Sequence, residues 1–296
     1  MLAAALFVST AAAAQDAPLV LEPSSAWHVD YADDSCRLSR TFGEGGNAVV
    51  AAMERSEPGD VFELAVAGPS LSIYDPPEAR YRFGPNGSNT QRFSDVGTFG
   101  AFAPALIADQ AALAGGANVV TQGTAQPRGQ PAASPTPTSQ QPGGSGHVSS
   151  TTVTWLEVGS PGRTAVRLAQ GPMAEPMAAL SACTDDLIAE WGLDVVAHRS
   201  LTRKATPANF IGNWMTDRDR PAGLLARGEH AVVRFRLIVD TAGKPTACHV
   251  QKSDVAEPFK TVTCKMLMRR ARFKPALDSD GAPVVSYFRS AVRFTG

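Results

Sequence analysis

The stretch Ala231-Val232-Val233-Arg234-Phe235-Arg236-Leu237-Ile238-Val239-Asp240 decides how the C-terminal part of the chain folds. Val233, Phe235, Leu237 and Val239 lie two residues apart, the spacing that sends alternate side chains to one face of a strand. Residues 240–244 follow as a turn with Gly243, where a positive φ costs little, and residues 245–252 resume the extended pattern. We therefore predict a β-hairpin.

A helix and a third strand complete this C-terminal unit. Pro258 suits the first turn of a helix, and the predicted helix 258–271 carries an apolar stripe of Cys264, Leu267, Met268 and Ala271. Residues 284–294 alternate again and predict a strand. Two strands, a helix and a strand, with the helix on one sheet face, form a small two-layer α+β domain over residues 228–296.

The motifs of this unit resemble a known family. They are the hairpin pattern from Gly228 through Phe235, Asp240 and Gly243, the run Arg-Ala-Arg-Phe-Lys-Pro-Ala at 270–276, and Gly-x-Pro-Val at 281–284. Together they resemble the C-terminal domain of the TonB energy-transducer family, over about a quarter of the chain.

The N-terminus has the features of a secretory signal peptide. Residues 1–14 are apolar with small residues at the end, and polar Gln15 and Asp16 follow. The run is shorter than the about 20 apolar residues that span a bilayer. We expect cleavage, a periplasmic protein and no integral span. The alternative is an inner-membrane anchor with the protein facing the periplasm.

The remaining chain is long enough for two domains, since domains typically have about 100–150 residues. Residues 15–196 predict a β-rich N-terminal domain of short strands and turns that ends in a helix with Met177, Leu180, Cys183, Leu187 and Trp191 on one stripe. Residues 122–150 are rich in Pro, Gly, Ser, Thr and Gln and predict a disordered insertion in it. Residues 197–227, interrupted by Pro and Gly, predict a linker between the two domains.

Four cysteines in an exported chain predict two disulfides. Cys248 faces the helix from the second strand of the hairpin, and Cys264 faces the sheet, so these two should pair. Cys36 and Cys183 are then left to pair within the N-terminal domain. His249 beside Cys248 raises a metal site as the alternative, but no second ligand has suitable spacing.

Charge and motifs argue against several functions. The residues from Gly228 onward hold 12 Lys and Arg against 6 Asp and Glu, a net charge of +6, and the part before them carries −7. An exported protein without an aromatic stacking array is not expected to bind nucleic acid. The sequence has no nucleotide-binding or zinc-hydrolase motif and no placed catalytic pair. We expect no enzyme, no cofactor and no metal.

The resemblance implies a contact module that binds outer-membrane receptors by strand addition in energy-coupled transport across the membrane. Strand 284–294 is the expected edge, and the side chains expected to meet a partner are Val285, Tyr287, Arg289 and Arg293. A homodimer through the same edge is compatible with this view. Two alternatives stay open, a scaffold for envelope proteins and a periplasmic hydrolase of an unrecognised kind.

Overall fold

The structure is a computed structural model that describes residues 17–74, 78–87, 90–113, 152–251 and 255–295. The predicted signal peptide and the insertion 122–150 lie outside the described residues. The chain forms two compact units. The first unit comprises the described residues within 1–26, 40–52 and 62–174, and the second comprises those within 27–39, 53–61 and 175–296.

Strands dominate the N-terminal part of the chain, as predicted. A five-stranded sheet has the order β1-β11-β10-β6-β7, and a six-stranded sheet has the order β2-β3-β4-β5-β9-β8. The strand bounds are β1 Leu19–Leu21, β2 His28–Tyr31, β3 Cys36–Phe42, β4 Val49–Arg55, β5 Phe62–Ala67, β6 Arg80–Pro85, β7 Gln91–Arg92, β8 Asp95–Phe99, β9 Phe102–Ala111, β10 Val153–Gly159 and β11 Val166–Leu168.

Aromatic side chains fill the core of the first unit. Phe83 on β6 packs edge-on against Phe62 at 6.0 Å between ring centroids, and against Tyr81 at the same separation. All three are almost fully buried. The Tyr81 hydroxyl donates to Gln91, and burial raises its pKa to about 12. These rings bury large apolar areas, which is the main favourable contribution to folding.

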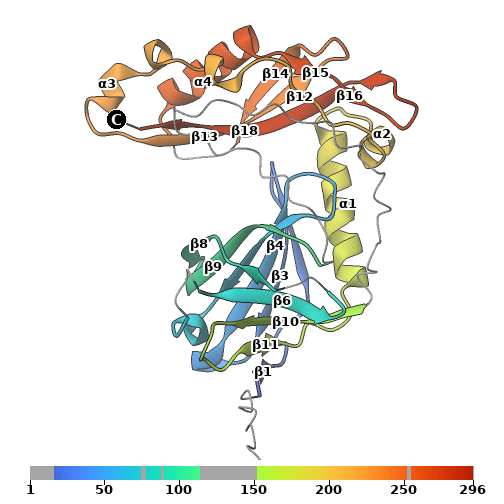
Figure 1. The fold of residues 1–296 in the computed structure, drawn as a ribbon, viewed down its shortest axis with the longest axis vertical. Coiled ribbons are helices and arrows are strands. Elements are labelled where there is room, and N and C mark those ends of the chain that lie inside the picture. The colour runs from blue at the N-terminus through green and yellow to red at the C-terminus, as the bar shows by residue number, and fades with distance from the viewer. Residues whose placement is uncertain (1–16, 75–77, 88–89, 114–151, 252–254, 296) are drawn as a thin grey trace, which may run out of the picture. The chain divides into compact units, whose positions relative to one another are not determined.

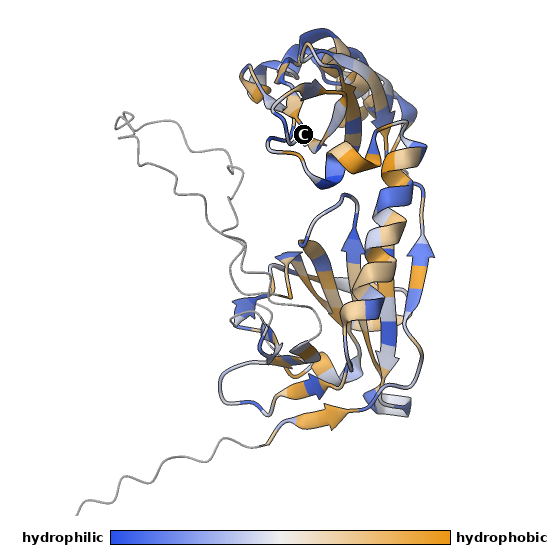
Figure 2. Ribbon diagram, turned by 90° about the vertical axis from the view of Figure 1, so that its right-hand side faces the viewer, coloured by the Kyte–Doolittle hydropathy of each residue, from blue (hydrophilic) through white to orange (hydrophobic). Residues whose placement is uncertain are grey.

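Helix α1 (Ala174–Glu190) confirms the predicted helix at the end of the N-terminal part. Met177, Leu180, Cys183 and Leu187 are buried, and apolar and polar residues interleave along the helix (Figure 2). Cys183 forms a disulfide with Cys36 on β3, with a Cα–Cα distance of 6.0 Å. A bond across a sequence separation of 147 residues restricts the unfolded chain strongly.

The C-terminal part contains the predicted hairpin, helix and final strand. Strands β13 (Ala231–Val239), β14 (Pro245–Val250) and β18 (Ser286–Phe294) form a sheet in the order β14-β13-β18. We call it the C-terminal sheet. Helix α4 (Glu257–Arg270) lies over one face of this sheet (Figure 1), and the disulfide between Cys248 and Cys264 joins β14 to α4.

The face of α4 that packs on the sheet includes the predicted stripe and extends beyond it. The buried residues of the helix are Phe259, Thr263, Met266 and Leu267, whereas Cys264 and Met268 are only half-buried. Leu267 and Ala271 belong to the core cluster of Phe235 and Leu237, and Met268 packs against it. Cys264 reaches sideways to the edge strand β14, and Phe259 packs on Phe294 at 4.9 Å between ring centroids.

Residues 197–227, predicted as a linker, contribute to the core of the C-terminal domain. Ala205 and Trp214 belong to the cluster formed with Phe235, Leu237 and Phe288. The Trp214 indole N–H donates to Asn209 at 2.7 Å, which satisfies the polar atom of this buried ring. The short elements between α1 and β13 include α2 Val195–Arg199, β12 Thr206–Pro207 and α3 Ala222–Leu225. Three short strands follow α4, namely β15 Phe273–Lys274, β16 Ala276–Leu277 and β17 Pro283–Val284, with β12 paired to β15 and β16 to β17.

Within the described residues, no helix is both long and apolar enough to cross a membrane.

The turn between β13 and β14 depends on Gly243. Its φ of +78° lies in the left-handed region, and a Cβ there would overlap the carbonyl of Phe273. We predict that Gly243→Ala lowers the stability by about 3 kcal/mol, because it adds a backbone clash to the left-handed penalty of about 1–2 kcal/mol.

Gly281→Ala is the matched control. Gly281 has a φ of +79°, but nothing lies within 4 Å of a Cβ there. It should therefore show the left-handed penalty alone. Urea unfolding of both variants, followed by circular dichroism, measures the difference in stability. Equal losses of stability in the two variants would contradict a destabilising contact with Phe273.

Candidate functional site

The open edge of β18 is the first feature of the C-terminal sheet that could meet a partner. β18 pairs with β13 along nine residue pairs, from Ala231 with Phe294 to Val239 with Ser286. β18 is the last strand in the order β14-β13-β18, so its other side has no neighbouring strand in the described part of the chain. An edge of this kind exposes a row of unpaired backbone groups.

The hydrogen-bond pattern identifies which residues of β18 face this edge. The Gln251 N–H donates to the Arg234 carbonyl, so the backbone of Arg234 points toward β14. In antiparallel strands neighbouring residues point alternately to the two sides, so the flanking Val233 and Phe235 point toward β18. Their partners Val292 and Ser290 point back toward β13.

It follows that Tyr287, Arg289, Ala291 and Arg293 direct their N–H and C=O groups to the open edge. We call these four the edge residues. No backbone hydrogen bond to them from outside the sheet is found within the described ranges. Three of the four side chains predicted to meet a partner belong to these residues, and the fourth, Val285, lies between β17 and β18 and is 44% exposed.

The side chains of the edge residues are not equally accessible. Tyr287 is only 9% exposed and Arg289 is half-buried, whereas Ala291 and Arg293 are exposed. The sequence predicted a solvent-facing row from Tyr287 to Arg293. The structure instead covers the first half of that row with other segments of the same unit.

An aromatic cluster covers Tyr287. Its ring meets Trp191 edge-on at 5.1 Å between centroids and stacks on His198 at 5.8 Å. Ile188 and Leu193 complete the cluster with Tyr287. Burial raises the pKa of the Tyr287 phenol, and the nearby Glu57 carboxylate raises it further, so the hydroxyl stays protonated and lies 3.3 Å from Glu57 Oε2.

His198 is held as a neutral ring. Its Nδ1 lies 2.7 Å from the Asp194 carbonyl and must donate there, which leaves Nε2 to accept from the Ser286 hydroxyl at 3.0 Å. Burial lowers the pKa of His198, while the Asp194 carbonyl and carboxylate act in the opposite direction. The imidazole therefore serves packing and orientation on this side of the sheet.

Charged side chains lie beside Tyr287 on the same face of the C-terminal sheet. Arg236 on β13 lies directly opposite Arg289 on β18. The Arg236 guanidinium donates to Asp34 Oδ1 at 2.8 Å, and its centre lies 3.8 Å from the centroid of the Trp191 ring. Desolvation lowers the pKa of Arg236, and Asp34 acts against that shift.

Arg289 has a similar environment, but no hydrogen bond joins it to a carboxylate among the described residues. Its Nε is buried without a partner among the described residues. Burial lowers its pKa, and the carboxylates of Glu57, Asp34 and Glu54 oppose this. Two cations therefore share one face of the sheet with acidic groups from residues 27–39 and 53–61.

These acidic residues are the part of the site that the sequence analysis missed. Asp34 lies 202 residues before Arg236, and Glu57 lies 230 residues before Tyr287. No local pattern marks either of them as a partner of the C-terminal sheet. The signal in the sequence that could have pointed to an acidic partner was Arg236, a charged residue between apolar neighbours on a strand.

The structure places the two residues of the metal alternative, Cys248 and His249, in other contacts. Among the residues that it describes, no three His, Cys, Asp or Glu side chains gather as metal ligands. Cys248 is bound in a disulfide and is not a free thiolate for coordination. His249 Nε2 instead lies 3.4 Å from Asp34 Oδ1.

Comparison with known proteins identifies the C-terminal domain. Residues 221–295 match the family described as Gram-negative bacterial TonB protein C-terminal, which confirms the resemblance drawn from the motifs. Domains of this family are non-catalytic and bind outer-membrane receptors. The match and the two disulfides suggest an envelope location. No curated protein and no solved structure was found to match the chain.

The pair of Asp34 and Arg236 should be needed for stability. Both side chains are about 10% exposed, so removing the carboxylate leaves a guanidinium charge in a desolvated place. We predict that Asp34→Asn lowers the free energy of unfolding by about 2 kcal/mol. Urea unfolding followed by tryptophan fluorescence measures this, because Trp191 lies against Arg236.

Asp33→Asn is the control for that measurement. Asp33 is exposed, and its change to Asn removes the same formal charge. The free energy of unfolding should therefore change by no more than about 0.5 kcal/mol. If both variants unfold at the same urea concentration, the buried pair contributes no net stability.

His198 predicts a dependence of stability on pH. Its pKa is lowered in the folded protein, so the unfolded chain binds a proton more readily as pH falls below about 6.5. Unfolding then takes up protons, and this residue makes the protein less stable toward pH 5. His198→Asn should flatten the fall of the melting temperature between pH 7.5 and 5.5. The exposed His28→Asn is the control, and an unchanged slope in His198→Asn would contradict the assignment.

Proposed function

We propose that the C-terminal domain is a protein-binding module of the cell envelope that accepts an extended segment of a partner at the edge of β18. The observation that carries the proposal is the row of four edge residues with outward backbone groups. An added strand would satisfy these groups with its own backbone, which gives affinity with little demand on sequence. The match to the TonB family supports an outer-membrane receptor as the partner.

The charge near this edge favours an acidic partner segment. Arg234 on β13 and Arg293 on β18 are exposed at the end of the sheet that residues 27–39 and 53–61 leave uncovered. Neither forms an ion pair within the described residues. Opposite charge on the incoming strand would speed its association and set its direction along β18.

Energy-coupled transport is the activity that this binding would serve. In this proposal the protein is exported to the periplasm and contacts a receptor segment there. The covered row of Tyr287 and Arg289 connects the edge strand to residues 27–39 and 53–61. A pull on the bound segment would thus act on a strand that is anchored on both of its faces.

A proline at Ala291 tests strand addition directly. The N–H of Ala291 points to the open edge and its side chain is exposed, so Ala291→Pro removes one donor to the partner and leaves the pairing with β13 in place. We expect at least a tenfold loss of affinity, or about 1.4 kcal/mol. Immobilised peptides from the periplasm-facing ends of outer-membrane receptors, measured by biolayer interferometry, provide the assay.

Two further variants serve as controls. Ala291→Ser keeps the N–H and should bind as the original protein does. Ser290→Pro removes a donor to β13 and should unfold the sheet, which circular dichroism detects. A folded Ala291→Pro protein that binds these peptides with unchanged affinity would rule out strand addition at β18. Sedimentation at rising concentration separates partner binding from a homodimer formed through the same edge.

A further inference from the structure

Two large apolar side chains are exposed on the turn that lies beside the end of helix α4. Phe210 is 74% exposed and Ile211 is 51% exposed. They form the start of a short 3-10 turn, Ile211–Asn213 with Phe210 before it. Neighbouring exposed apolar side chains with a polar rim are typical of sites that contact a protein or a membrane.

Hydrogen bonds fasten this turn at both ends to the last residues of α4. Before the turn, the Asn209 side chain donates to the Arg270 carbonyl at 2.9 Å and accepts from the Arg272 N–H at 3.1 Å. After the turn, the Trp214 carbonyl accepts from the Arg270 guanidinium at 3.4 Å. The turn with its two exposed apolar side chains is therefore held beside the C-terminal end of the helix.

Basic side chains gather at the same end of α4. Residues 265–274 contain five Lys and Arg and no Asp or Glu. Arg269 is exposed, and the Arg272 guanidinium folds back to donate to the Arg269 carbonyl at 3.1 Å. Lys265 lies one turn before Arg269 on the same side of the helix, and Lys274 is exposed two residues after Arg272. We give the name α4 patch to Phe210, Ile211, Lys265, Arg269, Arg272 and Lys274.

The four cations of the α4 patch have no acidic partner among the described residues. Arg270 is the basic residue of this segment that forms an ion pair there, with Asp219. Asp254 is the one Asp or Glu of the second unit outside the described residues. It comes before the start of α4, whereas Arg269 and Arg272 lie at the end of this helix, which has 14 residues and is about 20 Å long. The second unit therefore leaves the charge of the patch available to an external anion.

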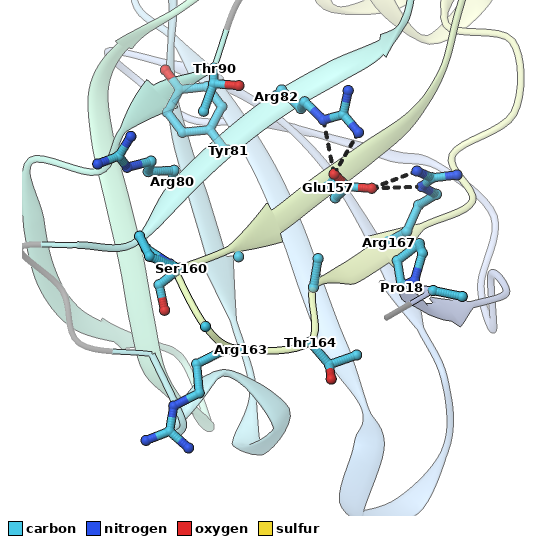
Figure 3. A pocket seen from close by; sticks show the side chains of 15 residues that line it. Pro18, Arg80, Tyr81, Arg82, Thr90, Glu157, Ser160, Arg163, Thr164 and Arg167 are labelled. Carbon is cyan, nitrogen blue, oxygen red and sulfur yellow. Dashed lines mark hydrogen bonds and ion pairs between the residues drawn. The ribbon is translucent and has the colours of Figure 1, made fainter. Parts of the chain in front are cut away.

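The arginines of the first unit provide the contrast of a compensated cluster. Figure 3 shows Arg82 and Arg167 turned toward Glu157, to which they donate at 2.8 Å and 2.6 Å. Both guanidinium groups also lie over the Trp155 ring, with their central carbons 4.8 Å and 4.3 Å from its centroid. Among the described residues, no carboxylate takes the corresponding place in the α4 patch, and the aromatic ring of the patch is exposed.

We infer that the α4 patch binds the surface of an anionic phospholipid membrane. Phe210 and Ile211 enter the layer between the headgroups and the acyl chains, where apolar side chains of peripheral proteins are stable. Arg269 and Arg272 donate to lipid phosphates, because a planar guanidinium matches two phosphate oxygens at once. Each cation beside an anionic surface strengthens binding about fivefold.

The composition of the α4 patch favours a membrane over a protein partner. Its apolar part consists of two adjacent residues with cations beside them, whereas a protein interface typically buries about 800 Å² on each partner around a larger apolar centre. A bilayer accommodates a single apolar turn and presents phosphates on all sides of it. The match to the TonB family suggests an envelope location, where such membranes are present.

The α4 patch and the edge of β18 are separate surfaces of the C-terminal domain. Helix α4 covers one face of the C-terminal sheet (Figure 1), and the exposed cations of the patch lie on the helix side. A partner strand would instead pair with the backbone of β18 at the edge of the sheet. Membrane binding by the patch is therefore independent of strand addition.

Cosedimentation of the full chain with vesicles tests the inference. Vesicles of phosphatidylglycerol and phosphatidylcholine in equal parts are the probe, and vesicles of phosphatidylcholine alone are the comparison. We expect at least tenfold tighter binding to the anionic vesicles, and this advantage should fall as the salt concentration rises. The double variant Arg269→Gln/Arg272→Gln should weaken that binding at least tenfold. Arg92→Gln/Arg163→Gln removes the same charge from exposed sites of the first unit and should change it less than twofold.

Substitutions of Phe210 test insertion separately from charge. Phe210→Ser should weaken binding to the anionic vesicles at least threefold, and Phe210→Trp should preserve it. Brominated phosphatidylcholine in these vesicles should quench the added indole, so Phe210→Trp should lose more fluorescence than the original protein does. Circular dichroism shows that each variant is folded.

Three results would overturn the inference. They are equal binding to anionic and phosphatidylcholine vesicles, equal weakening by the control pair and the patch pair, and no added quenching in Phe210→Trp. A polyglutamate peptide tests the alternative partner. If this peptide binds and Arg269→Gln/Arg272→Gln weakens its binding, while anionic vesicles do not bind, the patch is a site for an acidic protein segment instead.

Discussion

The burial of two arginines on one face of the C-terminal sheet is the constraint on which the second unit depends. Arg236 and Arg289 lie opposite each other on β13 and β18, with most of their surface removed from water. A guanidinium cannot lose its protons, so its charge must be matched where it is buried. Asp34 and Glu57 supply the negative charge, and both come from the first sixty residues of the chain. The C-terminal domain is therefore completed by segments far from it in sequence.

This arrangement determines which surface is left for a partner. Helix α4 and the disulfide to Cys264 occupy one face of the sheet, and the aromatic cluster around Tyr287 occupies the first half of the other. What remains is the backbone edge of β18 and the basic end near Arg293. When both faces of a sheet are covered, a partner can still pair with the edge strand, because that pairing uses backbone groups and requires no exposed side chain.

The first unit also contains a row of charged side chains, but there the carboxylate and the arginines lie on neighbouring strands of one sheet. Arg82, Glu157 and Arg167 form a cross-strand row in which the carboxylate satisfies its two neighbours. In the second unit the chain supplies the acidic partners of its buried arginines.

The sequence alone determined the elements of the C-terminal domain. The two-residue period of β13 and β18, the turn at Gly243 and the helix start at Pro258 are local signals, and each reflects the conformation of a few adjacent residues. The pair of Cys248 and Cys264 followed from the same local faces, and the pair of Cys36 and Cys183 followed by elimination. The tertiary structure alone decided that residues 197–227 supply Trp214 to the core, and that Tyr287 and Arg289 are covered. Alternation along a strand shows that two faces differ, but not what packs on each. Here the covering groups, Asp34 and Glu57, stand more than 200 residues away, and only folding brings them to the sheet.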